Sequence, residues 1–457
     1  MKIIVLGAGQ VGSTVAQNLA SENNDVTVVD LNMETLQDLN NRLDLSTVYG
    51  HAAYPEVLRQ AGAEDADMLI AATNSDETNM IACQIAYTLF QTTSRIARVR
   101  SQQYLIEKDA LFKKKHIPID VLISPERLVT DHIERIIEHP GAFQVVDFAD
   151  RRVRLVGVIV EEEAPMANQP ASHLQELLPE VEAFVATVYR KDKPIVHSDI
   201  DIIKNGDIVY YMAARENTVV VMQQFHQPDK PSKHVMIAGG GNIGMALAQR
   251  LESKYNVKLI EKNILRAEHL AENLDGTMVL NGDVADQELL VEENISAMGL
   301  FCALTNDDEA NILSAMVARK MGARKVMSLI NRHAYVELVE NGFIDVAISP
   351  HNVTIGALLR HVRRGDVVAV HSLRRGSAEA LEAIAHGDQT TSEVVGRSIA
   401  ELPLPSSSII GAIVRNGEVL IARNDLVIEA EDHVIVLVVN KGDIHDVEDL
   451  FQVGVTY

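Results

Sequence analysis

Two glycine-rich segments have the residue types and the spacing that hold the phosphates of a nucleotide. The first is Gly7-Ala8-Gly9-Gln10-Val11-Gly12 and the second is Gly239-Gly240-Gly241-Asn242-Ile243-Gly244. Each follows an apolar run that predicts a strand and opens a pattern that predicts a helix. An acidic residue ends the next predicted strand, Asp30 in the first case and Glu261 in the second. In this setting the pattern predicts two dinucleotide-binding clefts.

Each glycine of the first segment has its own expected task. Gly7 permits a tight turn, Gly9 lets the backbone approach a pyrophosphate, and Gly12 lets helix and strand pack closely. The start of the helix offers unpaired N–H groups and a partial positive charge to phosphate. A carboxylate at Asp30 would accept hydrogen bonds from ribose hydroxyls and repel a 2′-phosphate, which favours NAD over NADP. The alternative, glycines that serve only the backbone, has more weight in the second segment.

Further polar residues fall where the sheet edge would meet a ligand. Thr73 and Asn74 follow the fourth predicted strand, and Thr305 and Asn306 follow its counterpart. Their hydroxyl and amide groups could bond ribose or phosphate. Capping of the next helix by Thr73, Asn74 or Ser75 is an equal alternative. After the third strands, His51 and Asp283 could face the adenine or could be solvated loop residues.

Arg98 and Arg100 lie two residues apart on the fifth predicted strand of the first half, so they share a face. One of them, pointing into the cleft, could balance phosphate charge, and an ordinary surface or interface pair is the alternative. The second half has Ser328 and Ile330 near these positions, so its cleft should be less cationic. We therefore expect the two clefts to bind unequally.

An internal repeat extends beyond the glycine segments and indicates duplication. The further matches, in order, are Val29-Asp30 with Ile260-Glu261, Gly50-His51 with Gly282-Asp283, Thr73–Asn79 with Thr305–Asn311, Ile123–Pro125 with Ile348–Pro350, and Val188–Arg190 plus Ile208–Tyr210 with Ile413–Arg415 plus Val434–Val436. Residues 225–232, with two prolines, read as the connection between the halves.

Strand and helix patterns alternate in the front part of each half, which predicts parallel pairing with crossover helices. The fold class is therefore α/β, with two duplicated Rossmann-like doubly wound domains, each followed by a small α+β domain. Short β-branched runs at 153–160 and 433–439 belong to the small domains. The expected domains are 1–140 and 232–362 for the Rossmann-like pair, and 141–225 and 367–457 for the small pair.

Composition narrows the function further. A formal net charge of −23 repels nucleic-acid phosphates, so no nucleic-acid partner is expected. The two cysteines, Cys83 and Cys302, lie in apolar segments and should be inert core thiols of a reducing compartment. The sequence contains no recognisable metal-ligand spacing. Glu126, which follows Ser124-Pro125, is predicted to be a carboxylate at the start of a helix, and a metal ligand or an interface residue is the less favoured interpretation. No catalytic constellation is recognisable, so no catalytic residue is predicted.

The doubled arrangement resembles the TrkA family, the peripheral subunits of Trk-type bacterial potassium uptake systems, and more broadly the regulators of potassium conductance. The resemblance covers essentially the whole chain and is carried by Gly7–Gly12, Asp30, the segment 71–79 and their copies. It implies binding of NAD(H), with ATP or ADP as further candidates. The family's cofactor positions map onto Gly7–Val11, Asp30, Thr73, Asn74 and Arg98, and onto Gly239–Ile243, Glu261, Thr305 and Asn306.

The resemblance also implies a homotetramer whose Rossmann units form a ring beneath a TrkH-type membrane potassium channel. The protein would then be cytoplasmic and peripheral at the inner face of the membrane. The first hypothesis is thus a sensor that binds the nucleotide and does not consume it. An NAD-dependent oxidoreductase and an interaction scaffold with unused clefts are the alternatives.

Overall fold

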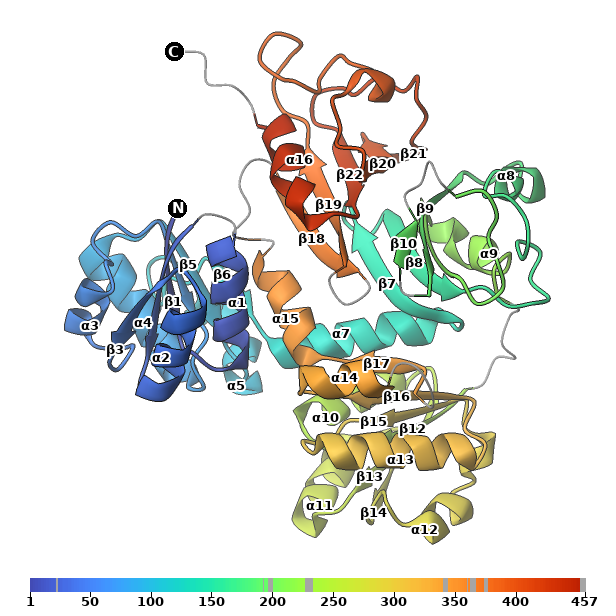
Figure 1. Ribbon diagram of the computed structural model, residues 1–457. Coiled ribbons are helices and arrows are strands. Elements are labelled where there is room, and N and C mark those ends of the chain that lie inside the picture. Colours follow the sequence, from blue (N-terminus) through green and yellow to red (C-terminus); the bar gives the residue numbers. More distant parts are fainter. Residues whose placement is uncertain are drawn as a thin grey trace. The chain divides into compact units, whose positions relative to one another are not determined.

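The first Rossmann-like domain forms around a parallel six-stranded sheet (Figure 1). The computed structural model describes residues 1–21, 24–191, 193–195, 200–226, 233–339, 344–359, 361, 367–373 and 377–452, so most of the predicted connection at 225–232 lies outside the described residues. The strand order is β3-β2-β1-β4-β5-β6. The strands are β1 (Lys2–Leu6), β2 (Asp25–Asp30), β3 (Ser46–Tyr49), β4 (Met68–Ala71), β5 (Ser94–Arg98) and β6 (Val121–Ile123).

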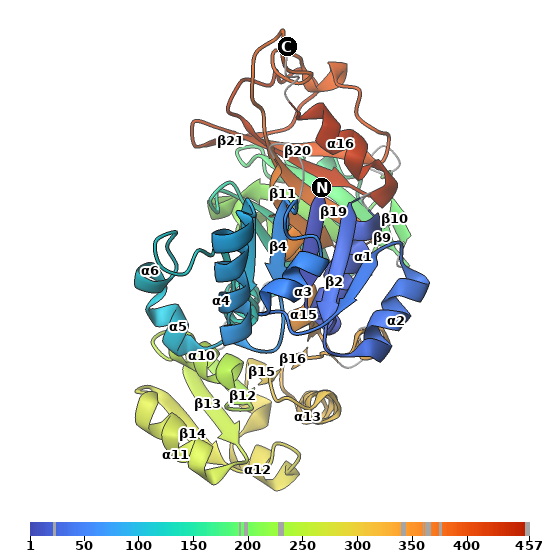
Figure 2. The same ribbon diagram turned by 90° about the vertical axis from the view of Figure 1, so that its left-hand side faces the viewer.

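Helices cross over between these parallel strands, and Figure 2 shows α1 and α4 beside β2 and β4. The apolar stripe of α1 faces the sheet, since Val15 and Leu19 are fully buried. The helices are α1 (Gln10–Ser21), α2 (Met33–Arg42), α3 (Pro55–Gln60), α4 (Asp76–Ile85), the π-helical η1 (Ala86–Phe90), α5 (Gln102–Ile106), α6 (Lys108–Leu111) and α7 (Pro125–Glu138).

The second Rossmann-like domain repeats this topology, with the strand order β14-β13-β12-β15-β16-β17. Its strands are β12 (His234–Ala238), β13 (Asn256–Glu261), β14 (Thr277–Asn281), β15 (Leu300–Ala303), β16 (Lys325–Leu329) and β17 (Val346–Ile348). Its helices are α10 (Asn242–Leu251), α11 (Ile264–Asn273), α12 (Gln287–Glu292), η4 (Ile295–Ala297), α13 (Asp308–Lys320), α14 (His333–Val339) and α15 (Pro350–Leu359). The duplicated doubly wound fold is confirmed.

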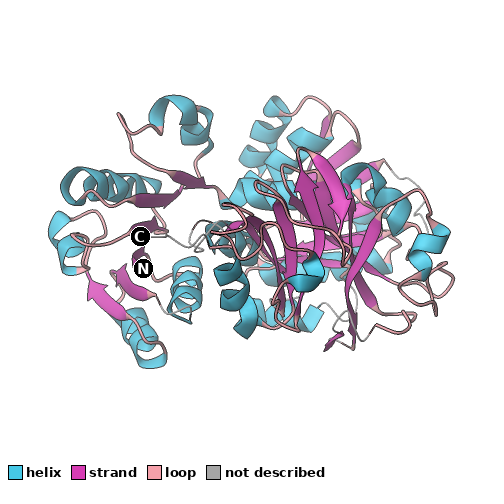
Figure 3. Ribbon diagram, turned by 90° about the horizontal axis from the view of Figure 1, so that it is seen from above, coloured by secondary structure: helices cyan, strands magenta, loops and turns pink. Residues whose placement is uncertain are grey.

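Two antiparallel five-stranded sheets make up the back parts, with strand orders β10-β9-β11-β8-β7 and β18-β19-β22-β20-β21 (Figure 3). The first contains β7 (Ala142–Phe148), β8 (Val153–Ile159), β9 (Ala183–Arg190), β10 (Lys193–Ile195) and β11 (Ile208–Ala214), with α8 (His173–Leu177), η3 (Arg215–Asn217) and α9 (Thr218–Met222). The second contains β18 (Val367–Leu373), β19 (Ala378–Ile384), β20 (Ser408–Arg415), β21 (Glu418–Ile421) and β22 (His433–Val438), with η6 (Ile399–Glu401), η7 (Lys441–Asp443) and α16 (Ile444–Leu450).

The two back parts share a buried ion pair that the sequence analysis did not predict. Arg190 pairs with the buried Asp207 at 2.7 Å, and Arg415 pairs with the buried Asp432 at 2.7 Å. Arg190 ends β9 and Asp207 precedes β11, so the first pair joins two neighbouring inner strands of its own sheet. Arg415 ends β20 and Asp432 precedes β22, so the second pair does the same in the other sheet. Because a buried carboxylate is costly to leave unpaired, each pair fixes the ends of the two strands that it joins.

The chain divides into two compact units that do not follow the two halves of the sequence. One unit contains Met1–Asp131 and His234–His361, which bring the two Rossmann-like domains together. The other contains His132–Lys233 and Val362–Tyr457, which bring the two antiparallel sheets together. Within the first unit, α15 packs on α1, and Arg250 of α10 forms an ion pair with Asp131 of α7. The two Rossmann-like domains therefore pack against each other, and so do the two antiparallel sheets.

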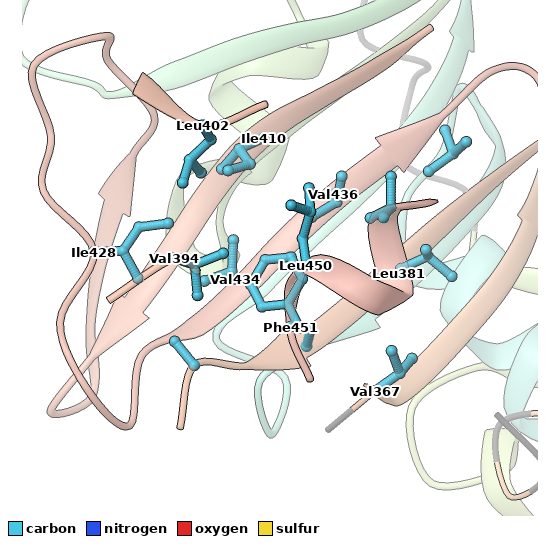
Figure 4. Packing of buried hydrophobic residues seen from close by; sticks show 14 of the residues in the cluster. Val367, Leu381, Val394, Leu402, Ile410, Ile428, Val434, Val436, Leu450 and Phe451 are labelled. Carbon is cyan, nitrogen blue, oxygen red and sulfur yellow. The ribbon is translucent and has the colours of Figure 1, made fainter. Parts of the chain in front are cut away.

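One apolar core of the second unit lies between α16 and the sheet of β19, β20 and β22 (Figure 4). Phe451 follows α16 and is 2% exposed, among Val394, Val434 and Val436. If the Phe451 ring were removed, the surrounding β-branched side chains could not move far enough to fill its volume.

We expect Phe451→Ala to lower the apparent free energy of unfolding of this unit by about 3–5 kcal/mol, because it leaves a cavity in a dry core. Urea unfolding followed by circular dichroism measures the change. The control is Val427→Ala at a residue that is 42% exposed, and this change should cost at most about 0.5 kcal/mol. Equal destabilisation by the two variants would contradict this packing.

Candidate nucleotide-binding site

A cavity of about 510 Å³ opens at the carboxyl ends of β1, β2, β4 and β5. Its wall contains most of the residues predicted for the first cleft: Gly7, Ala8, Gly9, Gln10, Val11, Asp30, His51, Thr73, Asn74 and Arg98. Gly12 and Arg100 are not part of the wall. The carboxyl edge of an open parallel sheet, where strand order reverses, is where such folds hold ligands.

The glycines of the first motif differ in what a side chain would meet. Gly7 has a φ of +102°, which favours glycine. A Cβ on Gly12 would lie 1.8 Å from the Gly7 carbonyl oxygen, so α1 can approach β1 only because this residue is glycine. A Cβ on Gly9 would meet nothing within 4 Å and would enter the cavity. The motif therefore leaves room for a ligand at Gly9 and for close packing at Gly12.

The second motif has the same geometry. Gly239 has a φ of +106°, a Cβ on Gly244 would lie 1.9 Å from the Gly239 carbonyl oxygen, and a Cβ on Gly241 would meet nothing within 4 Å. Asn242 and Ile243 begin α10 directly after this loop. The structure thus builds the same glycine turn twice.

Asp30 holds the first glycine loop as well as facing the cavity. Its Oδ2 accepts a hydrogen bond from the Ala8 N–H at 2.6 Å, and its Oδ1 accepts one from the Asn32 N–H at 2.7 Å. Glu261 makes the matching bonds with the N–H groups of Gly240 and Asn263, both at 2.8 Å. The acidic residue therefore positions the turn before any ribose hydroxyl reaches it, and the longer glutamate does so equally well.

A buried asparagine positions the polar residues after the fourth strand. The Asn79 amide oxygen accepts hydrogen bonds from the Thr73 N–H at 3.0 Å and the Thr73 hydroxyl at 2.7 Å, while its NH₂ donates to the Arg98 carbonyl. Asn311 does the same for Thr305 and the Leu329 carbonyl. The cap of α4 is Ser75, whose hydroxyl accepts from the Thr78 N–H, so Thr73 and Asn74 remain in the cavity wall.

The two arginines of the first half, Arg98 and Arg100, have different surroundings. Arg98 lines the cavity, and burial together with the nearby Arg100 lowers its pKa. Among the residues that the structure describes, its buried Nε has no hydrogen-bond partner, and neither has the buried Oε2 of Glu126, whose pKa burial raises. Arg100 instead donates to the Asn74 carbonyl and lies 3.9 Å from Asp76. An unsatisfied guanidinium N–H in the wall fits an anionic ligand.

At the opposite end the wall is formed by Leu31, Gly50, His51 and Ala52. The centroids of the His51 and Tyr54 rings lie 4.8 Å apart with the rings tilted by 30°, and the His51 Nδ1 accepts a hydrogen bond from the Ala53 N–H. This surface suits the flat face of a base. The predicted counterpart Asp283 is instead paired with Lys262 at 2.8 Å, and that hydrogen bond lowers the pKa of its carboxyl.

The strand register corrects one alignment of the two clefts. Ala97 pairs with Ala71 and Ser328 pairs with Ala303, so the counterparts of Arg98 and Arg100 are Leu329 and Asn331, one residue beyond Ser328 and Ile330. These counterparts are also uncharged. Arg266, which follows Asn263 as Thr35 follows Asn32, places a cation beside the second glycine loop and donates to the Gly240 carbonyl at 2.8 Å. The sequence pattern of α11 alone could not show that the Arg266 side chain bonds to the glycine loop.

The two cysteines lie in the cores of the two Rossmann-like domains. Cys83 and Cys302 are buried, and burial raises the pKa of each thiol to about 12, as expected for core thiols. Within the described ranges, no group of three His, Cys, Asp or Glu side chains could hold a metal ion. None of the described helices is long and apolar enough to cross a bilayer.

Fold and cleft together define the class, a protein with duplicated Rossmann-type nucleotide-binding domains. The TrkA-N domain matches residues 3–125 and 235–350, and the TrkA-C domain matches residues 389–452. The chain is 56% identical over 452 residues to the Trk system potassium uptake protein TrkA of Vibrio alginolyticus, covering 99% of both chains. It is 55% identical over 457 residues to the protein of the same name from Halomonas elongata, covering 100% of both. The chain belongs to the TrkA family.

A solved structure described as the GsuK channel bound to NAD has the same fold, with a TM-score of 0.60 at 16% identity. The similarity covers 98% of this chain and 78% of that chain. The GsuK RCK domain gives a TM-score of 0.59. At this identity the likeness shows the fold, which is that of the RCK domains.

Gly9→Val and Gly12→Ala should separate ligand binding from folding. Gly9→Val fills the cavity and should weaken NADH binding at least about tenfold, or roughly 1.4 kcal/mol, with little change in thermal unfolding. Gly12→Ala forces α1 from β1 and should cost about 1–3 kcal/mol of stability. Calorimetry in a Gly241→Val background isolates the first cleft. Unchanged affinity in folded Gly9→Val would remove this cleft from consideration.

Proposed function

We propose that this protein is the nucleotide-sensing regulatory subunit of a membrane potassium uptake system. The observation that carries the proposal is the first cleft, where Gly9 opens into a cavity walled by Asp30 and Arg98. Relatives at 55–56% identity are named Trk system potassium uptake proteins, which supplies the link to potassium. We propose the same four domains as the sequence indicates, namely residues 1–140, 141–225, 232–362 and 367–457.

The ligand is NAD(H), with ATP or ADP as competing nucleotides. In the proposed complex, Asp30 accepts hydrogen bonds from the adenosine ribose, the first turn of α1 holds the phosphates, and Arg98 neutralises their charge. His51 faces the adenine, and Thr73 and Asn74 reach the distal ribose or phosphate. In the second cleft the corresponding residues are Gly239–Gly244, Glu261, Thr305 and Asn306, with the uncharged Leu329 at the position of Arg98.

Sensing requires that nucleotide bind one arrangement of the domains more tightly than another. A switch from 1:99 to 99:1 needs a differential of about 5.5 kcal/mol, which several clefts in one assembly can share. We propose a homotetramer at the inner face of the membrane, bound to a TrkH-type channel subunit, since closed symmetric rings bury equivalent surfaces of each copy. The nucleotide is sensed and not consumed.

Asp30→Ala should weaken NADH binding at least about tenfold, because it removes charge-assisted bonds to ribose, each worth roughly 1.5–3 kcal/mol, and frees the Ala8 N–H from its carboxylate partner. Calorimetric titration of the full chain with NAD, NADH, ATP and ADP measures this. Asp44→Ala, an exposed carboxylate outside the cavity, is the control for lost charge. Equal affinities of the two variants would contradict the assigned role of Asp30.

Cells that lack the protein should grow poorly at limiting potassium, and the wild-type gene should restore growth better than the Asp30→Ala gene. Nicotinamide absorbance of the pure protein with candidate substrates tests the alternative oxidoreductase. Sustained oxidation or reduction that Asp30→Ala abolishes would replace the sensor by an enzyme.

A further inference from the structure

The first cleft is not built by the first half of the chain alone. Four residues of the second half line the same cavity: Asn331, Pro350, His351 and Thr354. Three of them come from the first turns of α15, which packs on α1 within the same compact unit (Figure 1). The second Rossmann-like domain therefore supplies part of the wall.

A hydrogen bond holds His351 against the phosphate-binding helix. The His351 Nε2 lies 2.8 Å from the Thr14 hydroxyl, and Thr14 is one turn into α1 from Gln10, which lines the cavity. The buried Thr354 donates its hydroxyl hydrogen to the Pro350 carbonyl and fixes the first turn of α15. The imidazole consequently stands beside the end of α1 that would receive phosphate.

The repeat shows that this position differs between the halves. Ser349-Pro350-His351 corresponds to Ser124-Pro125-Glu126, so an imidazole stands where the first half has a carboxylate. A carboxylate beside a phosphate is repulsive, whereas an imidazole can donate a hydrogen bond to it. The imidazole in place of a carboxylate therefore favours an anion beside the part of α15 that lines the first cleft.

We propose that the first cleft is a composite site in which His351 contacts the phosphate groups of the bound nucleotide. This inference rests on the proposed function of the cleft. The second half then senses directly whether the first cleft is occupied, without a conformational relay along the chain. Because α15 closes the phosphate end, His351 contributes more to a triphosphate than to a dinucleotide, and it helps to set the preference between ATP and NADH.

Calorimetry of full-length His351→Ala in the Gly241→Val background tests the contact. ATP affinity should fall about tenfold or more, as expected for loss of one hydrogen bond to a charged group, and NADH affinity should fall less. His351→Gln retains a donor and should recover most of the loss. Asn352→Ala, exposed on the same helix and outside the cavity, should bind as the Gly241→Val parent does.

Hydrogen exchange supplies a readout that does not depend on the variant's stability. Saturating ATP should protect the amides of α15 in the Gly241→Val chain, and it should leave them unchanged when Asp30→Ala is added. If the Gly241→Val chain binds ATP with unprotected α15 and His351→Ala keeps its affinity, the composite site is overturned and the nucleotide cleft stands. If neither that chain nor the wild type binds nucleotide, the proposed function itself fails.

Discussion

The close approach of α1 to β1 at Gly12 is the constraint on which the site depends. With less space than a methyl group between Gly12 and the Gly7 carbonyl, the helix begins directly above the strand end, and its first residues Gln10 and Val11 line the cavity. The positive φ of Gly7 and the Asp30 carboxylate on the Ala8 N–H fix the turn between them. The second half repeats all three features at Gly244, Gly239 and Glu261.

Local patterns predicted the repeated elements well because each is encoded by adjacent residues. The apolar run before the first glycine segment forms β1, and Gly12 allows the close helix–strand packing that its position predicted. The buried Asn79 escaped notice, although an asparagine six residues after each threonine was visible in both halves. Its role depends on a carbonyl of the neighbouring strand, which spacing alone does not reveal.

What the sequence did not indicate depends on contacts between distant segments. The packing of α15 on α1 joins residues more than 300 positions apart, as in the bond between Thr14 and His351. Grouping the front parts in one unit and the back parts in another is equally non-local. Ser328 lies near the position of Arg98, as the sequence indicated, but only the strand register identifies its neighbour Leu329 as the counterpart.

The two halves share a scaffold and differ in where an arginine lies, with Arg98 in the wall of the first cavity and Arg266 at the second glycine loop. Duplication followed by such divergence suits a sensor whose two halves respond to different nucleotides. The most direct test of this account is potassium flux through the TrkH-type channel reconstituted with this protein. Flux should respond to NADH or ATP with the wild-type chain and lose that response when Gly9→Val and Gly241→Val are combined. A nucleotide response that survives in the folded double variant would contradict the account.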